Sequence, residues 1–203
     1  RPLSDVYCPQ PRRERERPPL PRKFYEIRTW KSLLFVAYGV GTFVVLGQLA
    51  AVVSTMDIPI WLRVLVAAPA LLFAAHGVHL LGFIGHEGIH LILHPNRYVS
   101  ILLGMFVSSM SFFSAVGYAI SHWNHHRFTN QESDPDTIIF TPYQTLASRI
   151  LFARAGANRA YLRNTIATAR GDELPVGYKL PFRPHVQQRL AQLNLMFLLF
   201  WVG

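Results

Sequence analysis

The sequence predicts an all-α integral membrane protein, in which one or more transmembrane helical hairpins carry a histidine-rich helical cap on the cytoplasmic side. Three observations support this fold class. Hydrophobic residues make up 51% of the chain and stand in long charge-free blocks. A helix needs roughly 20 apolar residues to cross a bilayer, and two blocks reach that length. Eight of the nine histidines then fall between His76 and His126.

The first segment, residues 1–30, is predicted to be a basic, proline-rich cytoplasmic tail. Six prolines and seven Lys or Arg fall within its first 23 residues, a composition that cannot build an apolar core. Cys8 is the one cysteine, so no internal disulfide can form, which suits a reducing cytoplasm. Residues 31–203 are predicted to form one membrane domain. We expect it to be truncated, because the apolar run at 190–203 has the composition of a span that has only begun.

The two charge-free blocks predict transmembrane helices at about 33–53 and 62–85. The linker between them, STMDIP, is short, so the two helices form a hairpin. Nine Lys or Arg precede the first block, ten follow the second and the linker has none, which predicts that both chain ends face the cytoplasm. The membrane is then a bacterial inner membrane or the endoplasmic reticulum. The net charge of +9 follows from this asymmetry and from attraction to anionic lipid, so no nucleic-acid binding is predicted.

Two later segments are also predicted to lie at the membrane surface. Residues 100–120 carry no charge and are long enough for a third span, but they include five Ser and two Gly. An interfacial or re-entrant segment is favoured there. Residues 143–170 hold five Arg and scattered apolar positions, which predicts a cytoplasmic helix. That helix either lies on anionic headgroups or forms a solvated cap.

Histidines recur along one face of the second predicted helix. If that helix continues past Gly85, five imidazoles fall within an arc of about 80°. They are His76, His79, His86, His90 and His94. Three glycines, at 82, 85 and 88, leave the continuity of the helix open. The first two histidines either hydrogen-bond a neighbouring helix or border a substrate channel. The last one precedes Pro95 and is consistent with a helix end.

The stretch from His86 to His90 spells H-E-x-x-H, which has two incompatible interpretations. In zinc metalloproteases two such histidines hold the metal and the Glu acts as general base. The same residues are also a plain H-x3-H pair, which other metal chemistries use. A second cluster, HWNHH, places His122, His125 and His126 on one helical face of about 100°. Three imidazoles this close repel one another when protonated, so a cation among them is favoured.

Together these two boxes resemble the membrane fatty acid desaturase and hydroxylase superfamily. The run HWNHHRFTNQESDPDT, from His122 to Thr137, is similar to the H-x2-HH-x2-TN and DPD pattern of desaturases and carotenoid-modifying enzymes. The resemblance implies two non-haem irons as cofactor, held by imidazoles from the boxes. The implied ligands are His86, His90, His122, His125 and His126. No catalytic residue is predicted beyond these ligands.

The chain departs from the family pattern in two ways. Many relatives have His-Asp where this chain has His86-Glu87, so Glu87 is predicted to steady an imidazole from one methylene further out. Asp134 and Asp136 are further candidates for that supporting role, although a turn around Pro135 explains them equally well. The family also has a third histidine box, whereas only His185, in FRPHVQQR, follows the second box here. We expect a further H-x2-HH or Q-x2-HH in a longer parent sequence.

The resemblance implies an enzyme that uses O2 and two electrons to introduce a double bond into a fatty acyl or lipid chain. A lipid or carotenoid hydroxylase or ketolase on the same scaffold is the close alternative. An intramembrane zinc protease is a distant one, because it leaves the second box unexplained, and a truncated inactive chain is the non-enzyme alternative. The implied partners are a membrane lipid or acyl substrate, O2 and an electron donor such as ferredoxin or cytochrome b5.

Overall fold

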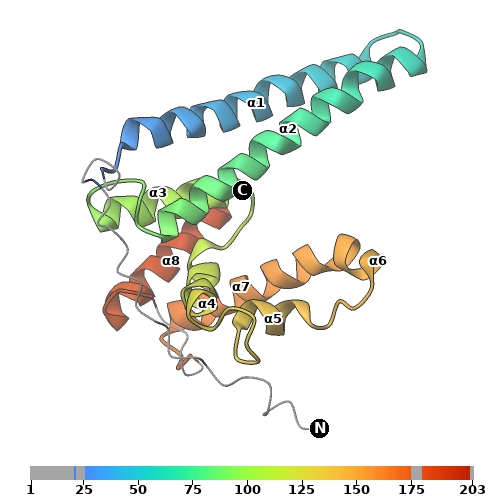
Figure 1. Ribbon diagram of the computed structural model, residues 1–203. Helices are drawn as coiled ribbons and strands as arrows, with labels where there is room; N and C mark the ends of the chain where they lie inside the picture. Colours follow the sequence, from blue (N-terminus) through green and yellow to red (C-terminus); the bar gives the residue numbers. More distant parts are fainter. Residues whose placement is uncertain (1–20, 22–25, 175–179, 202–203) are drawn as a thin grey trace.

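The computed structural model describes residue 21, residues 26–174 and residues 180–201. Within these ranges the chain is 77% helical and has no strand, so the predicted all-α class is confirmed. The predicted basic tail at 1–30, including Cys8, falls almost entirely outside the described residues. Figure 1 shows a long helical hairpin that projects from the group formed by the other helices.

The hairpin consists of α1, Thr29–Thr55, and α2, Ile60–Ile89. Both helices are long and apolar enough to cross a membrane, and both extend past the predicted spans at each end. They approach closely at Gly39 and Gly77, where a Cβ on either residue would meet the opposite helix. Arg63 bonds back to the hairpin loop, where its Nε donates to the carbonyl of Ile58 at 3.0 Å.

The second helix of the hairpin crosses α3, Arg97–Ser109, at a contact made of glycines. A Cβ on Gly88 would overlap with the backbone of Gly104, so the two helices can touch only because neither residue has a side chain. The loop between them closes on Asn96, whose side chain caps α3 by accepting the N–H of Tyr98 at 2.9 Å. The chain therefore turns sharply back beneath the hairpin.

The charge-free segment at 100–120, predicted as one interfacial or re-entrant piece, is divided between two helices. Helix α3 ends at Ser109, and α4 runs from Ala115 to Phe128. Phe112, in the break between them, has a left-handed φ of 52°. The segment is therefore two helices and not one straight helix, and His122 on α4 comes to lie beside His86 on α2.

The remaining helices follow α4 in the sequence, and α5, α7 and α8 pack against it. A short helix, α5, Pro135–Phe140, is followed by α6, Leu146–Ser148, a π-helical turn η3, Arg149–Ala153, and α7, Arg154–Arg170. Helix α8, Pro184–Phe200, runs beside α7 and α3 and contains most of the segment predicted to begin a further span. The main core lies among α3, α4 and α8. Its fully buried members include Ile101, Met105, Val116, Ile120 and Ala191.

The amino end of α4 is fastened by side chains from these neighbours. The backbone N–H of Gly117 donates to Thr165 Oγ1 on α7 at 2.8 Å, and that of Val116 donates to Asn194 Oδ1 on α8 at 3.0 Å. Ser114, at the N-cap position, makes no capping bond of its own. The first N–H groups of a helix have no acceptor within that helix, so side-chain oxygens from α7 and α8 accept those of α4.

Candidate metal centre

The first pair of histidines stands where the hairpin leaves its membrane-spanning part. Helix α2 continues without a break past all three glycines to Ile89, and His90 takes the C-cap position. His86 and His90 are therefore one helical turn apart and both half-buried. His94 lies beyond the helix end, where its Nδ1 accepts the N–H of Asn96 at 2.9 Å, so it is not part of the stripe.

The second pair comes from the carboxyl half of α4. His122 is buried and His126 is exposed, one turn further on. The position of α4 depends on Gly117, because a Cβ there would overlap with the carbonyl of Tyr161 on α7. This close approach lets α4 lie with His122 and His126 facing the end of α2.

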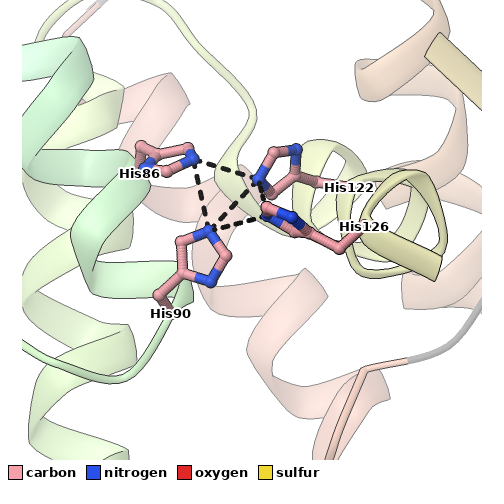
Figure 2. A group of neighbouring side chains, drawn as sticks. All are labelled: His86, His90, His122 and His126. Carbon is pink, nitrogen blue, oxygen red and sulfur yellow. Dashed lines mark hydrogen bonds between the residues drawn. The ribbon is translucent and has the colours of Figure 1, made fainter. Parts of the chain in front are cut away.

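The four imidazoles converge on one point through the same ring atom, as Figure 2 shows. Five of the six pairs of Nε2 atoms are 2.9 to 3.3 Å apart, and all four atoms lie within 4.8 Å of one another. Imidazole nitrogens held at about 2.1 Å from a metal would be about 3.0 Å apart in an octahedral site and about 3.4 Å apart in a tetrahedral one. The four nitrogens thus have the spacing of a ligand set.

Hydrogen bonding alone does not account for this arrangement. The nitrogens of His86, His90 and His122 form a triangle of mutual contacts at 3.0 to 3.2 Å. Each neutral Nε2 is either a donor or an acceptor, so any triangle contains two atoms of the same kind that repel. The nitrogens of His90, His122 and His126 form a second such triangle. A cation at the centre resolves both, because all four lone pairs can then point at it.

The electrostatics of the site favour uncharged imidazoles, which are the form that binds metal. Burial, together with the four neighbouring imidazoles, lowers the pKa of His122 to about 3. Burial, together with His86 and His126, also lowers the pKa of His90, although Glu87 acts in the opposite direction. These groups are therefore neutral near pH 7, with lone pairs available.

The carboxylate of Glu87 contacts an imidazole of the first box. Glu87 Oε1 lies 3.0 Å from Nδ1 of His86, the nitrogen that faces away from the cluster. A carboxylate accepts hydrogen bonds, so Nδ1 carries the proton and Nε2 keeps its lone pair. Partners of this kind hold a metal-binding ring in one tautomer and one orientation.

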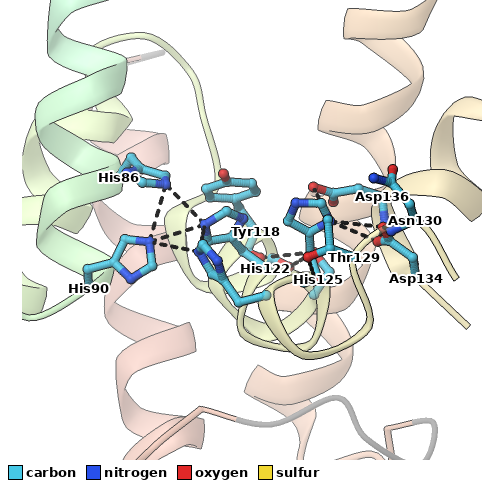
Figure 3. Close-up of polar contacts among 12 residues, drawn as sticks. His86, His90, Tyr118, His122, His125, Thr129, Asn130, Asp134 and Asp136 are labelled. Carbon is cyan, nitrogen blue, oxygen red and sulfur yellow. Dashed lines mark hydrogen bonds and ion pairs between the residues drawn. The ribbon is translucent and has the colours of Figure 1, made fainter. Parts of the chain in front are cut away.

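His125 lies outside the group of four nitrogens. Figure 3 shows its ring turned toward the loop after α4, where Nδ1 donates to the two carboxylate oxygens of Asp134 at 2.9 and 3.1 Å. Asp134 is 1% exposed and also accepts the N–H groups of Asn130 and Asp136. Burial acts to raise the pKa of Asp134, but these three hydrogen bonds outweigh it, so the pKa lies below its usual value. His125 is thereby left with a free lone pair on Nε2.

Asp136 approaches the same imidazole from the start of α5. Its Oδ2 lies 3.6 Å from His125 Nδ1, which is an ion-pair distance and longer than a hydrogen bond. Its other oxygen is buried without a partner. Burial raises the pKa of Asp136, with the Asp134 charge adding to that effect against the opposing imidazoles. Both predicted Asp residues therefore contact the second box, and Asp134 makes the closer contact.

The other histidines lie away from the cluster. His76 and His79 are exposed on α2 and line a shallow pocket with Leu72, Phe73 and Ala75. They share the helix that carries His86 and His90, and their role beside a substrate channel stays a prediction. His185 begins the first turn of α8 and borders a different pocket, together with Arg97.

Aromatic rings that the sequence reasoning missed lie beside the imidazoles of His122 and His90. Tyr118 stacks on His122, with ring centroids 4.6 Å apart, and Tyr161 of α7 meets Tyr118 edge-on at 5.2 Å. Trp123 lies 5.7 Å from the ring of His90. Tyr118 precedes His122 by one helical turn, and that spacing was a usable signal. Tyr161 and Trp123 could be assigned only from the fold.

Comparison with known proteins agrees with this geometry. A family model described as fatty acid desaturase matches residues 59–203, which is well over half of the chain. The chain belongs to the fatty acid desaturase family. No curated protein and no solved structure matches it. The part that matches the desaturase family begins just before α2 and includes both histidine boxes, α4 and the loop that bears Asp134.

Family membership and geometry together describe a membrane protein with a histidine centre that can hold a metal ion. The donor set is all imidazole nitrogen, which suits iron as well as zinc and copper. The resemblance inferred from the two boxes is thus confirmed at the level of the family.

Proposed function

We propose that this chain is part of a membrane-bound, non-haem diiron oxygenase that introduces a double bond into a fatty acyl or lipid chain. The reaction consumes one O2, two electrons and two protons for each pair of hydrogens removed, and releases two waters. The observation that carries the proposal is the convergence of four Nε2 atoms from two distant boxes, in a chain of the desaturase family.

The roles of the residues follow from their contacts. His86, His90, His122 and His126 would hold one metal ion through Nε2, and the free Nε2 of His125 would serve the second. Glu87 and Asp134 keep Nδ1 protonated on two of these rings, so that their lone pairs stay directed. When bound, iron supplies the redox chemistry that activates O2 toward an unactivated C–H bond. The centre would then lie beside the carboxyl end of the apolar helix α2, from which an acyl chain could approach.

A hydroxylase or ketolase on the same scaffold differs only in whether oxygen returns to the substrate carbon. No residue of the cluster distinguishes these outcomes. We propose desaturation because the family match carries that description.

The zinc protease interpretation of His86, Glu87 and His90 is disfavoured by the position of Glu87. A general base must reach a water on the metal, which lies on the Nε2 side of the rings. Here the carboxylate contacts Nδ1 of His86, on the opposite side of that ring. A protease centre also leaves an open position beside three protein ligands, whereas four imidazoles meet in this cluster.

We further propose that the centre lies on the cytoplasmic face of a bacterial inner membrane or of the endoplasmic reticulum, as the distribution of Lys and Arg indicates. An electron donor such as ferredoxin or cytochrome b5 would then approach from that side. The substrate would be a membrane lipid or an acyl chain.

The test is metal and product analysis of the full-length protein purified from membranes. We expect about two irons per chain on the family's pattern, and acyl products lighter by two hydrogens. His90→Ala and His125→Ala should both lower the iron content, whereas His94→Ala, outside the cluster, should not. One zinc per chain, retained after His125→Ala, would overturn the proposal. Full iron content without any acyl product would indicate the inactive alternative.

A further inference from the structure

An unusually apolar surface lies at the far end of the arm formed by α5, α6, η3 and α7. Four large side chains there are 59 to 75% exposed, although they are close together in the sequence. We call them the arm tip, and they are Leu146, Ile150, Leu151 and Phe152. Isolated exposed apolar residues are ordinary, but a contiguous group marks a surface that contacts another apolar phase.

The local structure holds these side chains outward. Thr145 and Ser148 form a capping box that starts α6, with Ser148 N–H donating to Thr145 Oγ1 at 3.1 Å. The next five residues form the π-helical turn η3. Only Ala153, at its end, is buried, and the inward face of α7 then continues through Ala157 and Tyr161. The arm therefore buries Ala153, Ala157 and Tyr161 and exposes the four apolar side chains of its tip.

The stretch of sequence that forms η3 and α7 carries charge of one sign. Residues 143–170 contain five arginines and no Asp or Glu. They are Arg149, Arg154, Arg159, Arg163 and Arg170. Arg149 stands within the arm tip, where its Nε donates to the carbonyl of Tyr143 at 2.9 Å. Apolar side chains flanked by arginines match the boundary between acyl chains and anionic headgroups.

The direction of the arm agrees with such a contact. In Figure 1 the arm extends from α4 toward the same side of the picture as the α1–α2 hairpin, with α6 at its outer end. A hairpin that spans the bilayer would put the bilayer on that side, and the arm tip would then lie on the bilayer side of the metal centre.

We propose that the arm tip inserts into the interface of an anionic bilayer and so anchors the arm that supports the second histidine box. Helix α7 carries Thr165, which holds the amino end of α4 at Gly117, and Tyr161, which packs on Tyr118 behind His122. A bilayer contact at one end of α7 therefore braces the helix that bears His122 and His126. This contact is separate from the metal centre and does not depend on the reaction proposed above.

The test measures the depth of the arm tip in the full-length protein, reconstituted in phosphatidylcholine vesicles with and without phosphatidylglycerol. A nitroxide is attached at Leu151→Cys in a background where Cys8 and any further cysteine of the full-length protein are replaced by Ser. Glu132→Cys, in the exposed turn after α4, is the matched control. Spin relaxation by O2 reports contact with acyl chains, and relaxation by a water-soluble nickel chelate reports contact with water.

The label at 151 should be relaxed more by O2 than by the nickel chelate, and the label at 132 should show the reverse. Adding phosphatidylglycerol should increase the preference at 151, and Arg149→Gln should reduce that increase several-fold. Strong relaxation by nickel at 151 in both vesicles would mean a solvated cap and overturn the proposal. Protection from both reagents would mean that protein covers the arm tip, and would overturn it equally. Iron content is not part of the readout.

Discussion

His122 has the most extreme environment of the four clustered residues, because it alone is buried and stacked on a tyrosine. Its Nδ1 has no hydrogen-bond partner, so this ring has no carboxylate to orient it. The stacked ring of Tyr118 orients the imidazole of His122 instead. By contrast, the rings of His86 and His125 are oriented by Glu87 and Asp134. At the residue scale the site therefore relies on two means of holding an imidazole, hydrogen bonding and stacking.

The first prediction concerns Glu87. In Glu87→Gln the amide oxygen can still accept the proton of His86 Nδ1, so iron content and part of the activity should remain. In Glu87→Leu that acceptor is lost, and metal affinity should fall about 10- to 100-fold. Metal titration of both purified variants measures the difference. Complete loss of activity in Glu87→Gln with full metal content would restore the general-base role of a protease.

The second prediction separates the two functions of Asp134. Asp134→Asn can still accept a backbone N–H at the start of α5, because Asn is also a good N-cap. The neutral amide of Asn cannot form a charge-assisted hydrogen bond with His125 Nδ1, so metal content should drop while the protein stays folded. Asp134→Ala also removes the helix cap, so its free energy of unfolding should be about 2 kcal/mol lower than that of Asp134→Asn. Thermal unfolding and metal analysis of the pair check this, and equal metal content in Asp134→Asn and the parent would contradict it.

At the scale of elements, small residues allow the helices to come close enough to form the site. Gly88 meets Gly104 between α2 and α3, and Gly117 meets Tyr161 between α4 and α7. In the sequence, the three glycines at 82, 85 and 88 left open whether α2 continues past Gly85. Two of them, Gly85 and Gly88, instead mark the place where α3 crosses α2, which a single sequence does not reveal.

The third prediction compares two glycines on that helix. A Cβ on Gly88 would overlap with Gly104, whereas a Cβ on Gly82 has open space around it. Gly88→Ala should therefore destabilise the fold by about 1–3 kcal/mol and weaken metal binding, because it pushes α2 away from α3. Gly82→Ala should change stability by less than about 1 kcal/mol. Thermal unfolding in detergent ranks the two, and equal effects would refute the close contact.

The fourth prediction concerns the support that α4 receives from α7. Thr165→Val keeps the shape of the side chain but removes the hydroxyl that accepts the N–H of Gly117. The free energy of unfolding should fall by about 1–2 kcal/mol, as it does when other helix caps are removed. Thr168→Val is the matched control, because Thr168 bonds only to its own helix, at the carbonyl of Asn164. If both substitutions destabilise the protein equally, α7 does not cap α4.

At the scale of the whole molecule, the cluster joins the hairpin to the helical cap. His86 and His90 belong to α2, and His122 and His126 belong to α4. A metal bound between them links the two parts, and a ligand that binds only the folded state stabilises it by mass action. The metal should therefore act as a structural brace in addition to any role in catalysis.

The fifth prediction follows from that brace. Iron(II) supplied at about 100 times its dissociation constant should stabilise the protein by about 2.7 kcal/mol, and a chelator should reverse the effect. His122→Ala should abolish the response, whereas His185→Ala should retain it, because His185 lies outside the cluster. Unfolding temperatures with and without metal measure this. An unchanged response in His122→Ala would place the metal elsewhere.

The sequence by itself determined the all-α class, the hairpin, the family and the two histidine boxes, because these depend on local composition and spacing. The spacing of the second box places His125 on the same helical face as His122 and His126. It does not determine which of these imidazoles join the cluster with His86 and His90. Only the tertiary structure decided that, since the crossing of α2, α3 and α4 brings four Nε2 atoms together while buried Asp134 turns His125 aside. Contacts between helices distant in the sequence depend on packing, and packing leaves little trace in the periodicity of one chain.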